Sequence, residues 1–143
     1  MANGTFILLT DQKPRSVNKS SERYVEYVAK AASARMQGKP KLTGALAAHI
    51  VWFHRTQADT DADNIAKRHL DGLRQVVFAD DSSIVRCTSE RVDLRRSIDV
   101  DVTTLGIEEL QQLLEMLGDT TRENIVFVRI EASSDAAIKL SPR

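Results

Sequence analysis

The segment from residue 59 to residue 82, DTDADNIAKRHLDGLRQVVFADDS, gathers carboxylates around one amphipathic helix. Six aspartates lie within this helix or beside its ends, namely Asp59, Asp61, Asp63, Asp71, Asp80 and Asp81. A helical wheel places Asp63, Lys67 and Arg74 in one polar stripe and most apolar residues on the other side, so the helix can bury one face. Carboxylates grouped in this way, with a lysine one turn from Asp63, predict a metal site built from oxygen ligands.

A calcium loop is the first alternative, and it fails at two positions. Read as an EF-hand loop that begins at Asp59, the segment has aspartates at the first, third and fifth positions. The sixth position should be glycine and is Asn64, and the twelfth should be a bidentate glutamate and is Leu70. These mismatches fall where the loop is most demanding, so they argue against calcium.

Length and composition predict one globular domain. The chain has 143 residues, of which 42% are hydrophobic and 28% are charged. No apolar run approaches the roughly 20 residues of a membrane span, and the N-terminal MANGTFILLT does not resemble a secretory signal. The lone cysteine, Cys87, permits no internal disulfide and is expected to be a core residue of a strand. We therefore expect a cytoplasmic protein that has no membrane partner.

The net charge of zero conceals an asymmetry along the chain. Residues 1–56 carry nine basic and three acidic residues, whereas residues 57–143 carry eleven basic and seventeen acidic residues. The first part could present a positive surface to a polyanion while the second part keeps carboxylates for a metal. Ordinary surface charge is the alternative interpretation of the same counts.

The hydrophobic pattern predicts an α+β domain with one mixed sheet in the order β-α-β-α-β-β, with helices on one side and the acidic site at one end. Strands are expected at residues 6–9, 43–53, 83–91 and 124–131, and residues 92–102 are expected to continue the third strand or pair with it. Helices are expected at residues 21–36 and 62–75. The apolar residues on both faces of 124–131 indicate a buried strand.

Two further features complete the predicted architecture. The segment GIEELQQLLEMLG has leucines at helical spacing and predicts an extra amphipathic helix at about residues 106–117, which ends at Gly118. Residues 1–131 are expected to form the domain, and residues 132–143 a flexible C-terminal tail.

The acidic segment resembles the motif of the RusA-type Holliday-junction resolvases. In these small endonucleases D-x-D-N-x-x-K is followed by an aspartate in the same helix, and then by hydrophobic-x-D-D-x-x-hydrophobic. Residues 61–67, DADNIAK, match the first part, Asp71 matches the helix aspartate, and residues 78–85, FADDSSIV, match the last part. The order of elements agrees over about residues 4–93. The extra helix within residues 103–124 and the neutral net charge depart from the family, whose DNA-binding members tend to be basic.

The resemblance implies a Mg²⁺-dependent, structure-specific endodeoxyribonuclease, a hydrolase that resolves Holliday junctions by paired symmetric nicks in DNA recombination and repair. It implies Asp61, Asp63 and Asp81 as ligands of Mg²⁺, for which Mn²⁺ could substitute, and adds Lys67 to the catalytic set. The chemistry agrees, because carboxylates hold Mg²⁺ with waters still attached and a lysine can stabilise charge on the phosphoryl oxygens. A surface ion pair of Lys67 with Asp63 or Asp71 is the alternative.

The expected partners are branched DNA, in the form of a four-way junction, and a second copy of the chain. Lys13, Arg15 and Lys19 lie in a predicted loop of the basic part and are expected to follow the DNA backbone. Two incisions related by a two-fold axis need two sites, so we expect a homodimer, with Trp52 and Phe53 as one apolar source for its interface and the leucines of the extra helix as another. A nuclease for other branched DNA, and a non-cleaving DNA- or protein-interaction module on the same fold, are the alternatives.

Overall fold

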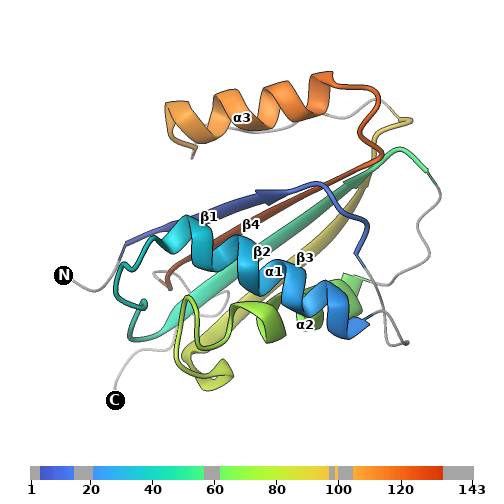
Figure 1. Ribbon diagram of the computed structural model, residues 1–143. Helices are drawn as coiled ribbons and strands as arrows, with labels where there is room; N and C mark the ends of the chain where they lie inside the picture. The colour runs from blue at the N-terminus through green and yellow to red at the C-terminus, as the bar shows by residue number, and fades with distance from the viewer. Residues whose placement is uncertain (1–3, 15–20, 57–61, 97–98, 100–104, 134–143) are drawn as a thin grey trace, which may run out of the picture.

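The computed structural model describes residues 4–14, 21–56, 62–96, 99 and 105–133 of the chain (Figure 1). In chain order the elements are β1 (Phe6–Thr10), α1 (Ser21–Met36), β2 (Leu46–His54), α2 (Ala62–Leu73), the short 3-10 helix η1 (Asp81–Ser83), β3 (Ile84–Asp93), α3 (Ile107–Gly118) and β4 (Asn124–Ala132). The strands form one mixed sheet, which confirms the predicted α+β fold.

The last strand of the chain lies inside the sheet. The strand order is β1-β4-β2-β3, with β4 antiparallel to both of its neighbours and β3 parallel to β2 at one edge. Ile130 of β4 lies between Phe6 of β1 and Ala48 of β2 in the register. The first five residues of β4 are all buried, which confirms that the apolar run at 124–131 is an inner strand.

Helices α1 and α2 together cover one face of the sheet (Figure 1). Side chains at alternate strand positions, such as Leu8, Ile50 and Val128, pack against Val28 of α1 and Ile65 of α2 in one core. This core fixes α2, the helix of the acidic motif, against the sheet.

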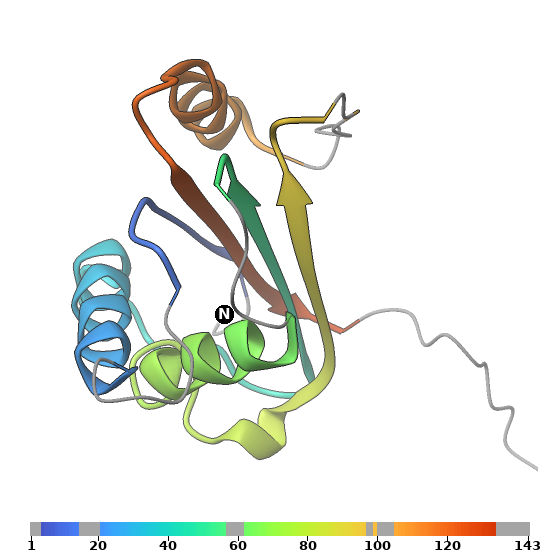
Figure 2. The same ribbon diagram turned by 90° about the vertical axis from the view of Figure 1, so that its right-hand side faces the viewer.

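Helix α3 lies over the opposite face, toward one end of the sheet (Figure 2). Leu113 and Met116 of α3 form a second core with Phe53 of β2 and with Ile125 and Phe127 of β4. The expectation that all helices share one side is therefore wrong for α3. Because β2 and β4 carry apolar residues on both faces, the second face also needs a cover, and α3 supplies it.

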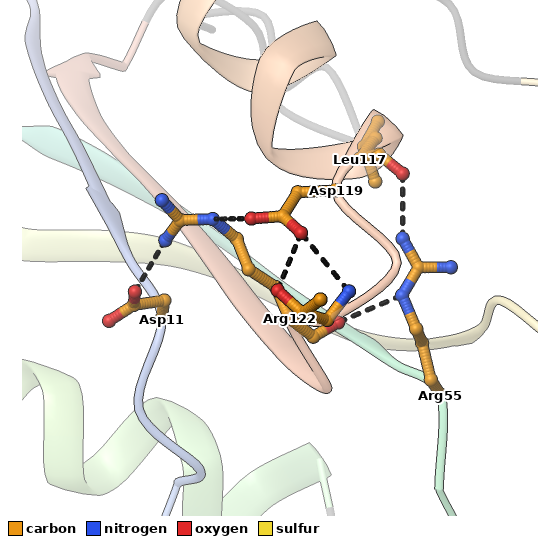
Figure 3. A network of polar contacts seen from close by, with 6 residues as sticks. Asp11, Arg55, Leu117, Asp119 and Arg122 are labelled. Atoms are coloured by element: carbon orange, nitrogen blue, oxygen red, sulfur yellow. Dashed lines mark hydrogen bonds and ion pairs between the residues drawn. The ribbon is translucent and has the colours of Figure 1, made fainter.

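Two arginines anchor the end of α3 to the sheet (Figure 3). The Nη2 atom of Arg55 donates to the carbonyl oxygen of Leu117 at 2.6 Å, and its Nε donates to the carbonyl oxygen of Arg122 at 2.8 Å. The guanidinium of Arg122 pairs with Asp119, Nε to Oδ2 at 3.2 Å, and with Asp11 just beyond β1. The bond to Leu117 satisfies a carbonyl group in the last turn of α3, where carbonyls lack partners within the helix.

The exposure of three side chains corrects two expectations, one about the dimer interface and one about the cysteine. Trp52 and Phe53 are 0% and 4% exposed, so they are core residues and offer nothing to a dimer interface. Cys87 is exposed on the edge strand β3, so the expectation that it belongs to the core is wrong. Part of the expected continuation of the third strand, at 97–98 and 100–102, and residues 134–143 of the expected tail lie outside the described residues.

Candidate active site

The start of α2 is fixed on the middle of β3. The Ser89 hydroxyl donates to the carbonyl oxygen of Ala62, the first residue of α2, at 2.7 Å. Ile65, His69 and Leu73 are fully buried on the inner side of the helix, at the spacing that the wheel predicted. The outer side of α2 is therefore the side that faces solvent.

Two of the predicted metal ligands, Asp61 and Asp63, belong to the segment that enters α2. Asp61 lies outside the described residues. Asp63 is the second residue of α2, although its side chain is not among those described. Lys67 follows one turn later and is exposed, so its ammonium group is accessible to a polyanion. These assignments stay predictions.

The other acidic pair opens η1, directly before β3. The hydroxyl of Ser82 donates to Oδ2 of Asp80 at 2.8 Å, and this bond contributes most to a lowered pKa of the Asp80 carboxyl. The side chain of Asp81 is 47% exposed, and its Oδ2 lies 3.3 Å from Nη1 of Arg74. Asp81 is therefore an accessible carboxylate next to a guanidinium, and Asp80 is engaged with its own turn.

Within one chain the two halves of the motif lie at opposite ends of α2. Arg74, the partner of Asp81, directly follows the last residue of the helix, whereas Asp63 is its second residue. Eleven residues of helix separate these positions by about 16 Å. The length of β3 gives a similar distance. Ser89 contacts the start of α2 and lies five residues after Ile84, the first residue of β3, which is about 16 Å along the strand.

Over the part of the chain that is described, no group of three or more His, Cys, Asp or Glu side chains could hold a metal ion. This search does not include the side chains of Asp61 and Asp63. The donor set that the motif offers consists only of carboxylate oxygens, which suit Mg²⁺ and Mn²⁺. The residues thus fit the implied metal in chemistry, while the fold of one chain holds Asp81 apart from the start of α2.

Other residues of the motif region have structural partners. Oδ2 of Asp71 lies 3.4 Å from Nη1 of Arg68, so this aspartate belongs to an ion pair on α2. His54 is buried, and its Nδ1 lies 2.7 Å from the carbonyl oxygen of Thr56, in agreement with a structural role. Of the three predicted DNA contacts, Lys13 lies in the described segment after β1, whereas Arg15 and Lys19 lie outside the described residues.

Sequence reasoning missed the pairing of Arg74 with Asp81. The wheel placed Arg74 in the same polar stripe as Lys67, seven residues earlier, and this was the available signal. The pairing itself depends on the chain reversal after α2, where Gln75 adopts a positive φ of 69° and its backbone N–H bonds to the carbonyl oxygen of Phe78. Periodicity does not reveal such a turn.

The acidic motif thus lies around α2, the helix that connects the parallel strands β2 and β3 of an α+β sheet. The family described as endodeoxyribonuclease RusA matches residues 10–103, and the chain belongs to this family. The resemblance to RusA-type Holliday-junction resolvases is thereby confirmed, and the family indicates an endodeoxyribonuclease that acts on junction DNA. A search of curated proteins found no match. Among the described residues, no helix is long and apolar enough to cross a membrane.

Proposed function

We propose that the protein is a Mg²⁺-dependent endodeoxyribonuclease that resolves four-way DNA junctions by paired symmetric nicks. The observation that carries this proposal is the family match over residues 10–103, because it spans α2, η1 and β3, where the acidic motif lies. Asp61, Asp63 and Asp81 hold the metal ion through carboxylate oxygens, and Mn²⁺ can replace Mg²⁺. The bound ion supplies Lewis-acid stabilisation and an activated water for phosphodiester hydrolysis.

Basic residues of the chain would bind and orient the DNA phosphates. Lys67 is exposed one helical turn after Asp63, so its ammonium group can approach a phosphoryl oxygen on which negative charge develops. Lys13, Arg15 and Lys19 contact the DNA backbone and contribute affinity through release of counterions. Replacing these three with alanine together should weaken binding to all sequences and flatten its dependence on salt, as a binding titration at several salt concentrations measures.

The separation along α2 supports a homodimer in which each site draws ligands from both copies. A two-fold axis that passes beside the outer side of α2, level with its middle and at right angles to it, brings the start of one helix beside the end of the other. Asp61 and Asp63 of one copy then meet Asp81 of the second copy. This arrangement produces two equal sites related by a two-fold axis, which paired incisions in strands of like polarity require.

Asparagine variants test both the nuclease and the composite site. Asp61→Asn, Asp63→Asn and Asp81→Asn should each abolish cleavage of a synthetic junction in Mg²⁺, while junction binding survives or tightens because negative charge is removed. Glu115→Gln on α3 is the control and should cleave normally. Near-normal cleavage by one of the three aspartate variants would remove that residue from the ligand set.

Mixing two inactive variants separates a composite site from a site within one chain. A heterodimer of Asp63→Asn with Asp81→Asn contains one composite site in which all ligands are intact, so it should nick one strand of the junction. If each chain forms its own site, both sites in the same heterodimer lack a ligand and no cleavage appears. Light scattering should give twice the chain mass of 15.9 kDa.

A further inference from the structure

An apolar stripe runs along the outer side of α3. Of the three exposed large hydrophobic side chains in the described part of the chain, two belong to this helix: Ile107 is 78% exposed and Leu114 is 55% exposed. They are seven residues apart, and Leu110, which is half-buried, lies between them on the same side. A contiguous apolar stripe that faces solvent marks a contact surface for another molecule.

Acidic residues border this stripe on one flank. Helix α3 contains three glutamates and no lysine or arginine. Glu109 is engaged with α1, because its Oε1 lies 3.4 Å from Nη2 of Arg35. The side chains of Glu108 and Glu115 are exposed and form no hydrogen bond or ion pair with any other described residue. They directly follow Ile107 and Leu114 in the sequence, so each apolar anchor has a carboxylate about 100° away around the helix.

The stripe is held in a fixed place by contacts at both ends of α3. Arg35 holds Glu109 in the first turn, while Arg55 and Arg122 hold the end of the helix and the residues after it (Figure 3). Leu113 and Met116 fix the inner side in the second core. Because the surface is already ordered, a partner that binds to it loses little conformational entropy on the side of this protein.

Charge decides which partner fits. DNA is excluded, because its phosphates would face Glu108 and Glu115. A second α3 from another copy would add three more glutamates without a basic residue to pair with them. We propose that the outer face of α3 is a docking site for a basic amphipathic helix of another protein. Apolar residues of that helix contact Ile107, Leu110 and Leu114, and its lysines or arginines face the carboxylates of Glu108 and Glu115.

The position of α3 in the fold makes this site separate from the nuclease site. Helix α3 lies beyond residues 10–103, so the surface is outside the part of the chain that matches the RusA family. It also lies on the face of the sheet opposite α2 (Figure 2). The protein can therefore bind DNA and the partner at the same time, and the inference does not depend on the proposed cleavage.

A labelled peptide tests the docking site on the full chain. The probe is a fluorescent 18-residue peptide of leucine and lysine with leucines at helical i, i+3, i+7 spacing, and its competitor has the same composition in scrambled order. Fluorescence anisotropy should show binding of the patterned peptide, at least tenfold tighter than the scrambled one. Ile107→Ser combined with Leu114→Ser should weaken this binding at least tenfold. Val85→Ser removes the third exposed hydrophobic residue, on β3, and should leave it unchanged.

Charge reversal gives an independent test that retains the apolar stripe. The variant with both Glu108→Lys and Glu115→Lys should no longer bind the leucine–lysine peptide. It should instead bind the same peptide with glutamate in place of lysine more tightly than the wild type does. Equal affinity of wild type and both α3 variants for every peptide would overturn the proposal. A change from dimer to monomer by light scattering in the Ile107→Ser, Leu114→Ser variant would also overturn it, since the stripe would then be a contact between copies.

Discussion

The hydroxyl oxygen of Tyr24 lies 2.9 Å from Nε2 of His69, and both residues are buried between α1 and α2. Nδ1 of His69 lies 2.8 Å from the carbonyl oxygen of Ile65, so Nδ1 carries the proton and Nε2 accepts a hydrogen bond from Tyr24. The two rings also meet edge to face, at 82° and with centroids 5.3 Å apart. This pair joins the helix of the acidic motif to α1.

The buried imidazole makes the stability of the fold dependent on pH. Burial lowers the pKa of His69 from 6.5 to about 4, so the folded protein keeps the ring neutral. As the pH falls below 6.5, this histidine binds a proton in the unfolded chain but not in the folded chain. The free energy of unfolding therefore decreases until about pH 4. The full effect of one such group is about 3 kcal/mol. Urea denaturation at a series of pH values across this window measures it.

Two variants isolate this contribution. Burial also lowers the pKa of His49, on the other face of the sheet, but this ring is only partly buried and lies beside Glu131, which opposes the shift, so His49→Gln should retain most of the pH dependence. Tyr24→Phe leaves Nε2 of His69 without a donor and should cost about 1–2 kcal/mol near neutral pH. Equal stability of the wild type above and below pH 6.5 would show that His69 is not held neutral.

The second prediction concerns Gly72. Replacing it with alanine should lower the stability of the fold, whereas the same change at an ordinary helix glycine raises it. In an exposed helix, alanine is about 1 kcal/mol better than glycine. A Cβ at Gly72 would lie 2.9 Å from the carbonyl oxygen of Val25 and 2.9 Å from the side chain of Val28. Gly72→Ala must therefore push α1 and α2 apart and should destabilise the fold by about 1–3 kcal/mol in thermal or urea denaturation. Gly118→Ala, where a Cβ meets open space, is the control and should be neutral or stabilising.

Periodicity and end signals were sufficient to predict the elements. The expected start of α2 at residue 62 and the end of α3 at Gly118 agree with the structure, because apolar spacing and a terminal glycine are local properties. The inner position of β4 also followed from its apolar residues on both faces. Local pattern thus predicted each helix and strand, although β2 begins at Leu46 instead of residue 43 and α2 ends at Leu73 instead of residue 75.

Tertiary arrangement accounts for what the sequence did not predict. An amphipathic helix can cover either face of a sheet, so the pattern of α3 did not indicate which face this helix covers. The same holds for Gly72, whose helical cost was visible in the sequence whereas its close approach to Val25 was not. The separation of Asp63 from Asp81 likewise depends on how α2 lies along β3, and motif spacing does not report this.

Lys67 gives the third prediction, which concerns turnover. Because its positive charge is needed most when charge develops on the phosphoryl oxygens, Lys67→Ala should lower kcat at least tenfold and junction affinity less. Lys67→Arg should restore activity only in part, since a planar guanidinium replaces a compact ammonium group. Single-turnover cleavage at saturating enzyme measures the first effect and a binding titration the second. Lys30→Ala removes an exposed lysine of α1 and is the matched control. Normal cleavage by Lys67→Ala at saturating enzyme would mean that Lys67 only contacts a phosphate and does not assist the reaction.

Arg74 gives the last prediction, which concerns metal affinity. Its guanidinium lies 3.3 Å from Oδ2 of Asp81, and the two side chains are 44% and 47% exposed, so the pair contributes little to folding. A cation beside a carboxylate nevertheless opposes the approach of a second cation. Arg74→Gln should therefore leave the free energy of unfolding within about 0.5 kcal/mol of wild type and tighten Mg²⁺ binding up to about fivefold.

Titration calorimetry with Mg²⁺ in the absence of DNA measures this effect apart from cleavage. Arg96→Gln is the control, because Arg96 is exposed and its Nε lies 4.0 Å from the carboxylate of Asp93, which is not one of the proposed metal ligands. When Asp81→Asn is also present, Arg74→Gln should no longer change the affinity, since the guanidinium acts through the Asp81 carboxylate. Unchanged Mg²⁺ affinity in the single variant Arg74→Gln would mean that Arg74 does not compete with the ion for Asp81. A gain in affinity that persists without the Asp81 carboxylate would instead assign the effect to the general field of the protein.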